Sequence, residues 1–419
     1  MKTTTSADAP RPSPFETSQL SGSPIAQHAV DVAVRCRPAR PQTSGDWVEC
    51  VALPENRVAM AVGSVVGRGR RAHAWTGRLR GAVRDLASTG LAPDELLGRL
   101  DHLVARWDRS SDDWHGSVRG ATCLYAIYDQ VSRRCAVSRA GHQPPAVVSP
   151  DGRVYFPEVA AGPPLGLDHG SFTTTEWEVP EGSQLLLCGH GLARCRGRGR
   201  GRGGDDAGCA LLREVLRRAG TRNGVGDPEE VCAAVFDALR PARPGGAVAL
   251  LVARTHGMRA DQIADWDVPS EPAAVADLRA AVTRQLAQWG LSDLVFTTEL
   301  ILSELVSNAM RYTTGPIHLR LLRDHALTCE VFDCSTAIPH LHQASAKDES
   351  GRGLFLVARL AERWGARHTQ TGKVIWSEQP LPRSAPDGTT PGPHAARDSV
   401  PSPRMPSSDL APARTGGTR

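Results

Sequence analysis

The most informative segment of this sequence is Glu299-Leu-Ile-Leu-Ser-Glu304-Leu-Val-Ser-Asn308-Ala-Met-Arg-Tyr312. Its apolar residues recur at helical spacing, which predicts a helix. Glu304 and Asn308 are four positions apart, so they share one face of that helix. A carboxylate and a carboxamide are costly to bury without partners, and a metal ion with phosphates would supply such partners. For this helix alone, a solvated polar face remains the alternative.

Three further motifs follow this helix. They are VFDCS at 331–335, ESGRGL at 349–354 and GKVIW at 372–376. Asp333 stands just past an apolar strand, where its carboxylate can accept a hydrogen bond from the exocyclic amine of a base. Gly351 and Gly353 precede a helix, where backbone N–H groups can approach a polyphosphate and the helix N-terminus favours negative charge. The motifs therefore indicate a nucleotide site.

In this order, the four motifs resemble the GHKL superfamily, most closely its bacterial anti-sigma-factor serine-kinase branch, over residues 262–380. The resemblance implies a Bergerat α/β sandwich that binds ATP and Mg²⁺. It assigns Mg²⁺ ligation to Asn308, the general-base role to Glu304 and adenine recognition to Asp333. Gly351, Arg352 and Gly353 would bind the nucleotide in the phosphate lid.

The pattern of residues 262–380 predicts helices and strands in alternating groups. The expected helices are Glu271–Trp289, one that starts near Ser292 as N-cap, and Gly353–Trp364; the expected strands are Ile317–Leu322, Leu327–Phe332, Ala366–His368 and Val374–Glu378. This order predicts a helix layer on one mixed sheet. No phosphoacceptor-histidine motif precedes it, which argues against a sensor histidine kinase.

Residues 29–255 have a different texture, with many short apolar runs separated by Gly and Pro. The expected strands include Arg57–Val66, Ala121–Tyr128, Gln184–Cys188 and Ala247–Ala253; the expected helices are Ala72–Thr89, Ala92–Trp107, Ala210–Ala219 and Pro228–Leu239. Strands and helices in separate runs predict an α+β domain with helices packed on sheets.

This region resembles a SpoIIE-like, PPM-type serine/threonine phosphatase, which implies a β-sandwich flanked by helices. The motifs that carry the resemblance are SGDW at 44–47, VGSVVGRG at 62–69, ATCLY at 121–125, AGHQPP at 140–145, GPPLGL at 162–167, LCGHGL at 187–192 and GAVALLVAR at 246–254. Active members hold two divalent metal ions with aspartates and thereby generate a nucleophilic hydroxide.

Most of those aspartates are missing here. By the resemblance, Asp46 is the one retained ligand, and the other three positions hold Ser64, His190 and Gly246. Arg68 replaces a histidine of the family pattern and adds positive charge. Binding of two Mn²⁺ or Mg²⁺ ions against this charge balance is not expected. The resemblance therefore implies a retained fold with a degenerate metal site.

Other residues of this region offer weaker routes to a metal site. Glu49, Glu55, Asp205 and Asp206 stand in no matching motif, and Asp46 with His190 supplies only two ligands, which rarely make a site. His142 is a candidate acid, but the family uses its segment as framework. Ten cysteines without a C-x-x-C pair predict reduced thiols rather than zinc or disulfides.

Composition limits the remaining function classes. The net charge of +4 over 419 residues gives no general case for nucleic-acid binding. An Arg/Gly run at 193–204 is read as a solvated loop, with RNA binding as the alternative. No long apolar window or signal sequence is present, which predicts a cytoplasmic protein without a membrane anchor. Residues 1–28 and 381–419 are expected to be disordered tails.

Together these patterns predict an ATP-binding regulator of a partner-switching circuit. Its partners would be a STAS-type anti-sigma-factor antagonist, a sigma factor or both, and a homodimer fits the kinase branch. The chain would be a protein serine kinase or a sigma-sequestering module with an impaired phosphatase domain. Two alternatives stay open: an active metal-dependent phosphatase acting on a phosphorylated STAS-type protein, and a non-catalytic, nucleotide-gated scaffold.

Overall fold

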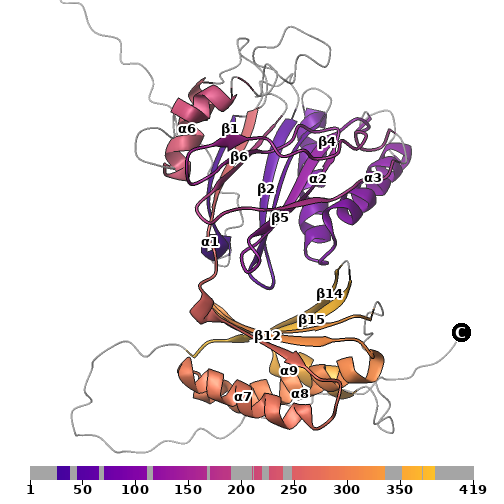
Figure 1. The fold of residues 1–419 in the computed structure, drawn as a ribbon. Helices are drawn as coiled ribbons and strands as arrows, with labels where there is room; N and C mark the ends of the chain where they lie inside the picture. The colour runs from indigo at the N-terminus through magenta and orange to yellow at the C-terminus, as the bar shows by residue number, and fades with distance from the viewer. Residues whose placement is uncertain are drawn as a thin grey trace, which may run out of the picture. The chain divides into compact units, whose positions relative to one another are not determined.

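The protein is described here by a computed structural model, drawn in Figure 1. The described residues are 26–37, 45–65, 70–110, 117–167, 170–189, 210, 212–218, 226–238, 248–335, 352–369 and 371–382. The predicted tails lie almost wholly outside these ranges. A short helix, α1 (Ala26–Ala29), already starts inside the segment assigned to the N-terminal tail.

The N-terminal region contains two five-stranded antiparallel sheets. One has the order β2-β3-β4-β5-β8 and the other β1-β10-β9-β6-β7. The strands are β1 (Val30–Arg37), β2 (Gly45–Leu53), β3 (Arg57–Val65), β4 (Thr122–Asp129), β5 (Arg134–Ala140), β6 (Ala146–Val148), β7 (Val154–Tyr155), β8 (Thr175–Glu178), β9 (Gln184–Cys188) and β10 (Val248–Thr255). Apolar side chains from the facing surfaces form one core between the sheets. The predicted β-sandwich is confirmed.

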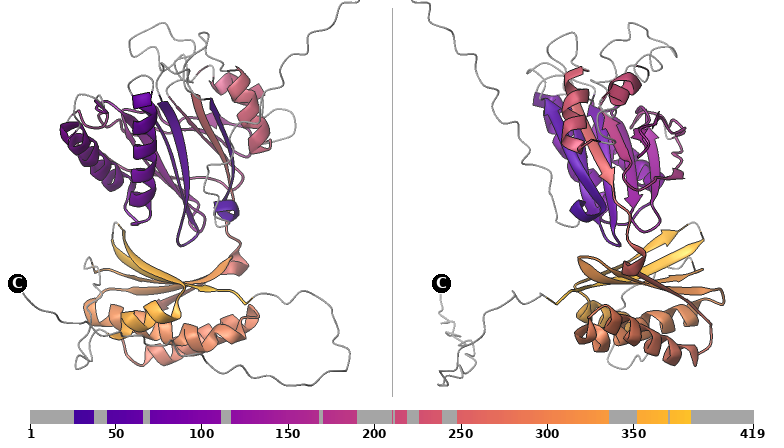
Figure 2. Two further views of the ribbon diagram at one scale, coloured as in Figure 1. Left: turned by 180° about the vertical axis from the view of Figure 1, so that it is seen from behind. Right: turned by 60° about the vertical axis from the view of Figure 1, so that its left-hand side comes forward.

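Helices cover both outer faces of this sandwich (Figure 2). Helices α2 (Arg70–Ala87) and α3 (Pro93–Ser110) pack on the first sheet, and α6 (Pro228–Ala238) packs on the second. Strand β3 is buried along its whole length because one face meets the other sheet and the other face meets the helices. The result is a four-layer α–β–β–α arrangement.

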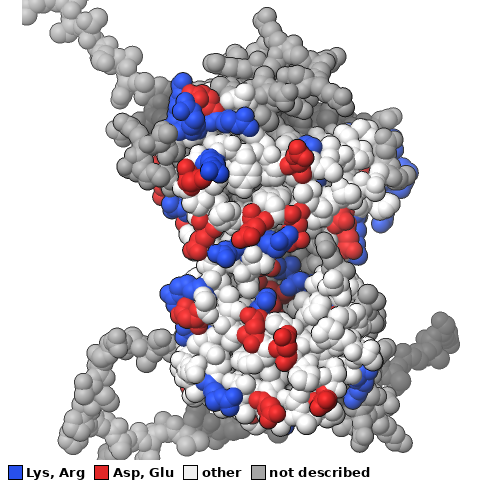
Figure 3. Space-filling model, viewed as in Figure 1, with Lys and Arg blue, Asp and Glu red and all other residues white. Residues whose placement is uncertain are grey.

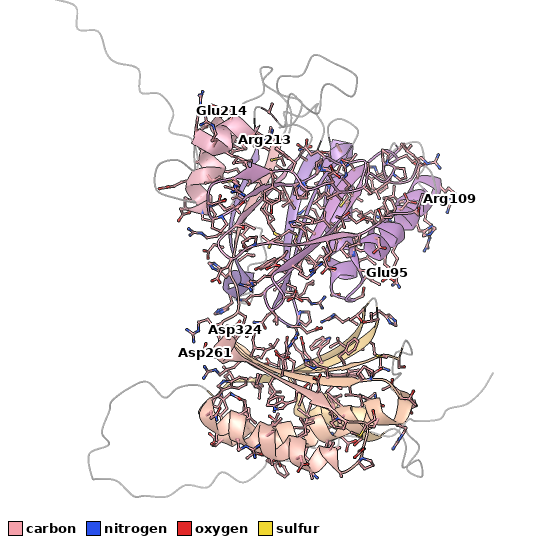
Figure 4. All side chains as sticks on the ribbon, viewed as in Figure 1. Glu95, Arg109, Arg213, Glu214, Asp261 and Asp324 are labelled. Carbon is pink, nitrogen blue, oxygen red and sulfur yellow. The ribbon has the colours of Figure 1, made fainter. Side chains whose placement is uncertain are left out.

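Helix α3 shows why the local sequence predicts this structure well. Leu96, Leu97, Leu100 and Val104 recur at helical spacing, and each is fully buried against the sheet. Acidic Asp94 and Glu95 lie in the first turn and Arg109 in the last, where they complement the helix dipole. Figure 4 labels Glu95 and Arg109 at the two ends of this helix.

The C-terminal region is one five-stranded sheet with helices on one face (Figure 1). The strand order is β11-β12-β13-β15-β14. The elements are β11 (Ile263–Val268), α7 (Ala274–Gln288), α8 (Val295–Tyr312), β12 (Ile317–Arg323), β13 (Ala326–Asp333), α9 (Arg352–Leu360), β14 (Arg363–Thr369) and β15 (Gly372–Pro380), with 3₁₀ turns η1 (Ala260–Gln262) and η2 (Ser292–Leu294). The predicted helix layer on a sheet is confirmed.

The prediction of a mixed sheet is wrong, since every strand pair here is antiparallel. Strands β11 and β12 are joined by two helices, α7 and α8, and an even number of helical passes returns the chain antiparallel. The two pairs β12–β13 and β14–β15 are consecutive strands joined by short connections, which also favours antiparallel pairing.

Two predicted helix ends are also wrong. Ser292 is not an N-cap: it begins η2, and α8 starts at Val295 behind Leu294, which makes no side-chain cap. The helix predicted to reach Trp364 ends at Leu360, because Arg363 and Trp364 pair with β15 as part of β14. Tertiary pairing overrides local helix signals at such boundaries.

The surface of the described residues carries both signs of charge. On the face drawn in Figure 3, basic and acidic side chains are interspersed. In the same parts of the chain, no helix combines the length and apolarity needed to cross a bilayer. The Arg/Gly run at 193–204 lies outside the described residues.

Candidate functional site

The predicted pair Glu304 and Asn308 lies on α8. The helix is anchored by its apolar side, where Leu305 and Val306 are fully buried in the core beneath the sheet. Glu304 and Asn308 are partly buried, one turn apart, on a different side from exposed Ser307. The 3.6-residue period therefore places a carboxylate and a carboxamide together, as the sequence predicts.

Helix α9 begins directly against the Glu304 carboxylate. A methyl group at Gly353 would lie 2.3 Å from Glu304 Oε2 and 3.2 Å from its Cδ. Only a residue without a side chain permits this approach. The first turn of α9, with its N–H groups free of helical partners, is thus held beside the carboxylate of α8.

Asn308 has an unsatisfied donor. Its Nδ2 atom is buried and has no hydrogen-bond partner among the described residues. A buried amide N–H without a partner costs about 1–3 kcal/mol. Such a cost is tolerated at sites where a ligand supplies the missing partner, so this atom supports the predicted binding role.

Asp333 is the last residue of β13 and is fully buried. The Ser335 N–H donates to its Oδ1 at 2.7 Å. The Lys373 ammonium forms an ion pair with the other carboxylate oxygen, Oδ2, at 3.3 Å. The geometry of this contact is not that of a hydrogen bond, so Oδ2 has no hydrogen-bond partner among the described residues. One acceptor at the strand end therefore remains available.

Lys373 is a buried charged residue beside Asp333 to which the sequence analysis assigned no role. It is 1% exposed and lies directly opposite Asp333 in the antiparallel pair β13–β15. The signal was present, because the GKVIW motif contains it. What could not be read from the motif was the register that sets it beside the aspartate.

Glu304, Asn308 and Gly353 thus lie where α8 meets α9. Asp333 ends β13, a strand that packs against α8 in the core. Gly351 and the side chain of Arg352 lie outside the described residues. The described part of the predicted constellation has the donors and acceptors that ATP with Mg²⁺ requires: an amide oxygen for the cation, N–H groups for phosphates and an acceptor for a base.

The retained carboxylate of the phosphatase-like region is Asp46, on β2. Ser64 is its cross-strand neighbour on β3, and the Ser64 hydroxyl donates a hydrogen bond to Asp46 Oδ1. A methyl group at Gly189 would lie 2.5 Å from Asp46 Oδ2, so the chain closes over the other oxygen. The aligned positions His190 and Gly246, and also Arg68, lie outside the described residues.

The Cys36 thiol lies close enough to Asp46 to respond to its charge. Cys36 is exposed as a residue, but its sulfur is largely buried, and this burial raises the pKa of the thiol to about 11. The positive charge of Arg80 lowers that pKa, and the negative charge of Asp46 raises it further. A neutral thiol binds divalent metals poorly. Within the described ranges, no three His, Cys, Asp or Glu side chains converge as a metal site.

The alternative ligands considered from the sequence have other partners. Glu49 is buried and accepts hydrogen bonds from Arg80 at 3.0 Å and Arg84 at 2.7 Å. Glu55 is buried in an ion pair with Arg57 at 3.3 Å. Both carboxylates are neutralised by guanidinium groups. Asp205 and Asp206 lie outside the described residues.

His142 is held within the framework of the sandwich. It is 2% exposed, and its Nδ1 lies 3.1 Å from the Gln143 carbonyl oxygen. Its own carbonyl accepts a hydrogen bond from Arg139 at 2.8 Å. These contacts fix the segment between β5 and β6, as expected for a structural histidine.

Comparison with known families supports the division seen in the fold. Residues 54–256 match the family described as Stage II sporulation protein E (SpoIIE). Residues 268–377 match the family described as histidine kinase-like ATPase domain. The chain joins a SpoIIE domain to a histidine kinase-like ATPase domain. Both resemblances inferred from the motifs are thereby confirmed.

Individual relatives match different shares of the chain. The chain is similar to the phosphoserine phosphatase RsbU of Bacillus subtilis strain 168, with 25% identity over 179 residues, or 42% of this chain and 51% of RsbU. The match thus spans about half the length of that relative. A solved structure of the RsbU and RsbW domains of Rv1364c from Mycobacterium tuberculosis covers 84% of this chain and 93% of its own, with 22% identity and a TM-score of 0.46. The phosphatase domain of SpoIIE from Bacillus subtilis, with a regulatory fragment, covers 55% of this chain at 16% identity and a TM-score of 0.43.

Proposed function

We propose that the ATPase domain binds ATP with Mg²⁺ and that the chain is a regulator in a partner-switching circuit. It would either phosphorylate a serine of a STAS-type antagonist or sequester a sigma factor. The observation that carries this proposal is a pair of unsatisfied buried atoms, Asn308 Nδ2 and Asp333 Oδ2, in the two motifs expected to bind the nucleotide. Both atoms gain partners if the nucleotide binds there.

The roles of the residues follow from their chemistry. The Asn308 carboxamide oxygen is a suitable ligand for Mg²⁺, which needs few protein ligands when phosphates and waters supply the rest. Bound ATP supplies the phosphoryl group. Glu304 would accept the proton of the attacking serine hydroxyl, and the N–H groups at the start of α9 would position the phosphates. Phosphoryl transfer needs little beyond such positioning and charge neutralisation.

In the same proposal, the SpoIIE domain has kept its fold without two-metal chemistry. Asp46 is engaged by the Ser64 hydroxyl, and Glu49 is engaged by two arginines. The domain would then hold a partner protein or regulate the ATPase domain. This function needs the surface of the sandwich and no bridging hydroxide.

Nucleotide binding is the first test. Calorimetry on the full chain with ATP and Mg²⁺ should give a measurable affinity, which Asn308→Ala lowers by about 10-fold or more, the loss expected for a charge-assisted contact. Ser307→Ala is the matched control, because Ser307 is the exposed neighbour on the same helix. Failure of the unsubstituted protein to bind ATP would refute the proposal.

Phosphoryl transfer is the second test. The protein is incubated with labelled ATP and a STAS-type acceptor, and phosphoserine is measured. Glu304→Gln keeps the volume of the side chain but removes its basicity, so transfer should fall while ATP binding persists. ATP binding without transfer to any partner serine would exclude the kinase and leave sigma-factor sequestration or the nucleotide-gated scaffold.

The second candidate function is an active metal-dependent phosphatase. The similarity to the phosphoserine phosphatase RsbU and the retained Asp46 favour it. Phosphoserine hydrolysis is measured with Mn²⁺ for the unsubstituted protein, for Asp46→Ala and for Asp85→Ala, which alters an exposed carboxylate on α2. Metal-dependent turnover that Asp46→Ala abolishes and Asp85→Ala preserves would establish this activity.

A further inference from the structure

A buried lysine lies beside the aspartate expected to read the base. Lys373 is 1% exposed, its ammonium is 3.3 Å from Asp333 Oδ2, and it donates a hydrogen bond to Ser335 Oγ at 3.2 Å. Arginine supplies nearly all of the positive charge of the chain, and lysine occurs only at positions 2, 347 and 373. A compact ammonium at this position is therefore a specific feature.

The contacts of Lys373 do not use all of its hydrogen-bonding capacity. An ammonium has three N–H donors, and the described contacts are one hydrogen bond to Ser335 and the ion pair with Asp333. Burying a lysine is costly unless its charge is paired and its donors are satisfied. Asp333 Oδ2 likewise has no hydrogen-bond partner among the described residues.

A donor and an acceptor thus stand side by side at the ends of two adjacent strands. The edge of adenine carries the complementary pair, since its N6 amine is a donor and the neighbouring ring N1 is an acceptor. A group with adjacent donor and acceptor atoms can satisfy both protein atoms at once. A site of this kind rejects ligands that leave either buried group unpaired.

We propose that Lys373 is a base-recognition residue that donates a hydrogen bond to adenine N1 while Asp333 accepts one from the N6 amine. This inference rests on the proposed binding of ATP. It adds a direct, charged contact to the base and makes Lys373 a determinant of nucleotide specificity. Ser335 acts as a positioning residue, since its N–H and hydroxyl hold Asp333 Oδ1 and the Lys373 ammonium, respectively.

Nucleotide analogues test the contact without any substitution. Affinities of the full chain for ATP, 1-deaza-ATP and 7-deaza-ATP are measured by calorimetry with Mg²⁺. The 1-deaza analogue replaces the N1 acceptor by C–H, so its affinity should be about 10- to 100-fold lower than that of ATP, as for loss of a charge-assisted hydrogen bond. The 7-deaza analogue, which keeps N1, is the control and should bind like ATP.

A substitution of Lys373 tests the same contact from the side of the protein. Lys373→Met keeps a long side chain without charge, so it should bind ATP more weakly and no longer distinguish ATP from 1-deaza-ATP. Equal affinity of the unsubstituted protein for ATP and 1-deaza-ATP, or a preference for GTP, would overturn the role of Lys373 while leaving nucleotide binding in place. Absence of any ATP binding by the unsubstituted protein would instead overturn the proposed function, and this inference with it.

Discussion

Gly353→Ala is expected to separate stability from phosphoryl transfer. The new methyl group would lie 2.3 Å from Glu304 Oε2, where a relaxed carbon–oxygen contact needs about 3.3 Å, so the carboxylate must move by about 1 Å. The obstructing atom is the end of a flexible side chain, which can rotate away at little cost to the fold. Alanine also favours a helix over glycine by up to about 1 kcal/mol. The variant should therefore be as stable as the unsubstituted protein, or slightly more so.

Phosphoryl transfer should respond differently. Displacement of a catalytic group by about 1 Å can lower a rate by about 100-fold, equivalent to about 2.7 kcal/mol of transition-state stabilisation. The affinity for ATP should change much less, because alanine keeps the backbone N–H assigned to the phosphates and Glu304 is assigned to the serine hydroxyl. The assay compares the rate of phosphoserine formation at saturating ATP, the affinity for ATP and the thermal midpoint of unfolding.

Gly98→Ala on α3 is the matched control, since a methyl group there has no atom within 4 Å. It should change neither transfer nor ATP binding. If Gly353→Ala transferred phosphate at the normal rate, the proposed position of the base would be wrong. If it lost transfer only through unfolding, the thermal midpoint would reveal it and the argument from close approach would fail.

Burial raises the pKa of Glu330 to about 8, so this carboxyl takes up a proton on folding. The free energy of unfolding should therefore fall as pH rises from about 4.5 to about 8, with a slope of at most about 1.4 kcal/mol per pH unit. Glu330→Gln should flatten that slope in urea unfolding, and an unchanged slope would contradict this prediction. Glu49→Gln should lower the free energy of unfolding by about 2 kcal/mol, because it removes the charge that two arginines share, and an unchanged urea midpoint would count against that ion-pair cluster. Cys334 is exposed next to Asp333, so ATP with Mg²⁺ should slow its alkylation, measured on its own peptide by mass spectrometry. The reference is the rate with Mg²⁺ and no nucleotide, and equal rates with and without ATP would place the nucleotide elsewhere.

Local patterns predicted most of the elements on which the candidate site depends. The strand Gln184–Cys188 matches its prediction at both ends, and α8 carries Glu304 and Asn308 on one face as their spacing requires. These features depend on periodicity within one element, which the chain displays directly. The motif order was likewise sufficient to recognise both domains, because each motif is a short continuous segment.

The errors in the predicted helices lie at helix ends. Ser292 has the residue type of an N-cap, but it begins a 3₁₀ turn. Trp364 was predicted to end a helix, but it belongs to β14 and pairs with β15. At Trp364 the pairing with β15 outweighs a local preference of a few tenths of a kcal/mol. The all-antiparallel pairing also depends on how two helices return the chain, which no single segment records.

The sequence by itself determined which residue types stand in the nucleotide motifs and which residues stand at the positions where the phosphatase motifs carry aspartate. Tertiary structure alone decided their partners: Lys373 beside Asp333, Gly353 against Glu304, and the Ser64 hydroxyl on Asp46. Residue type and helical phase are local properties of the chain. Strand register and the approach of two helices bring together residues far apart in sequence, and they depend on packing the whole core.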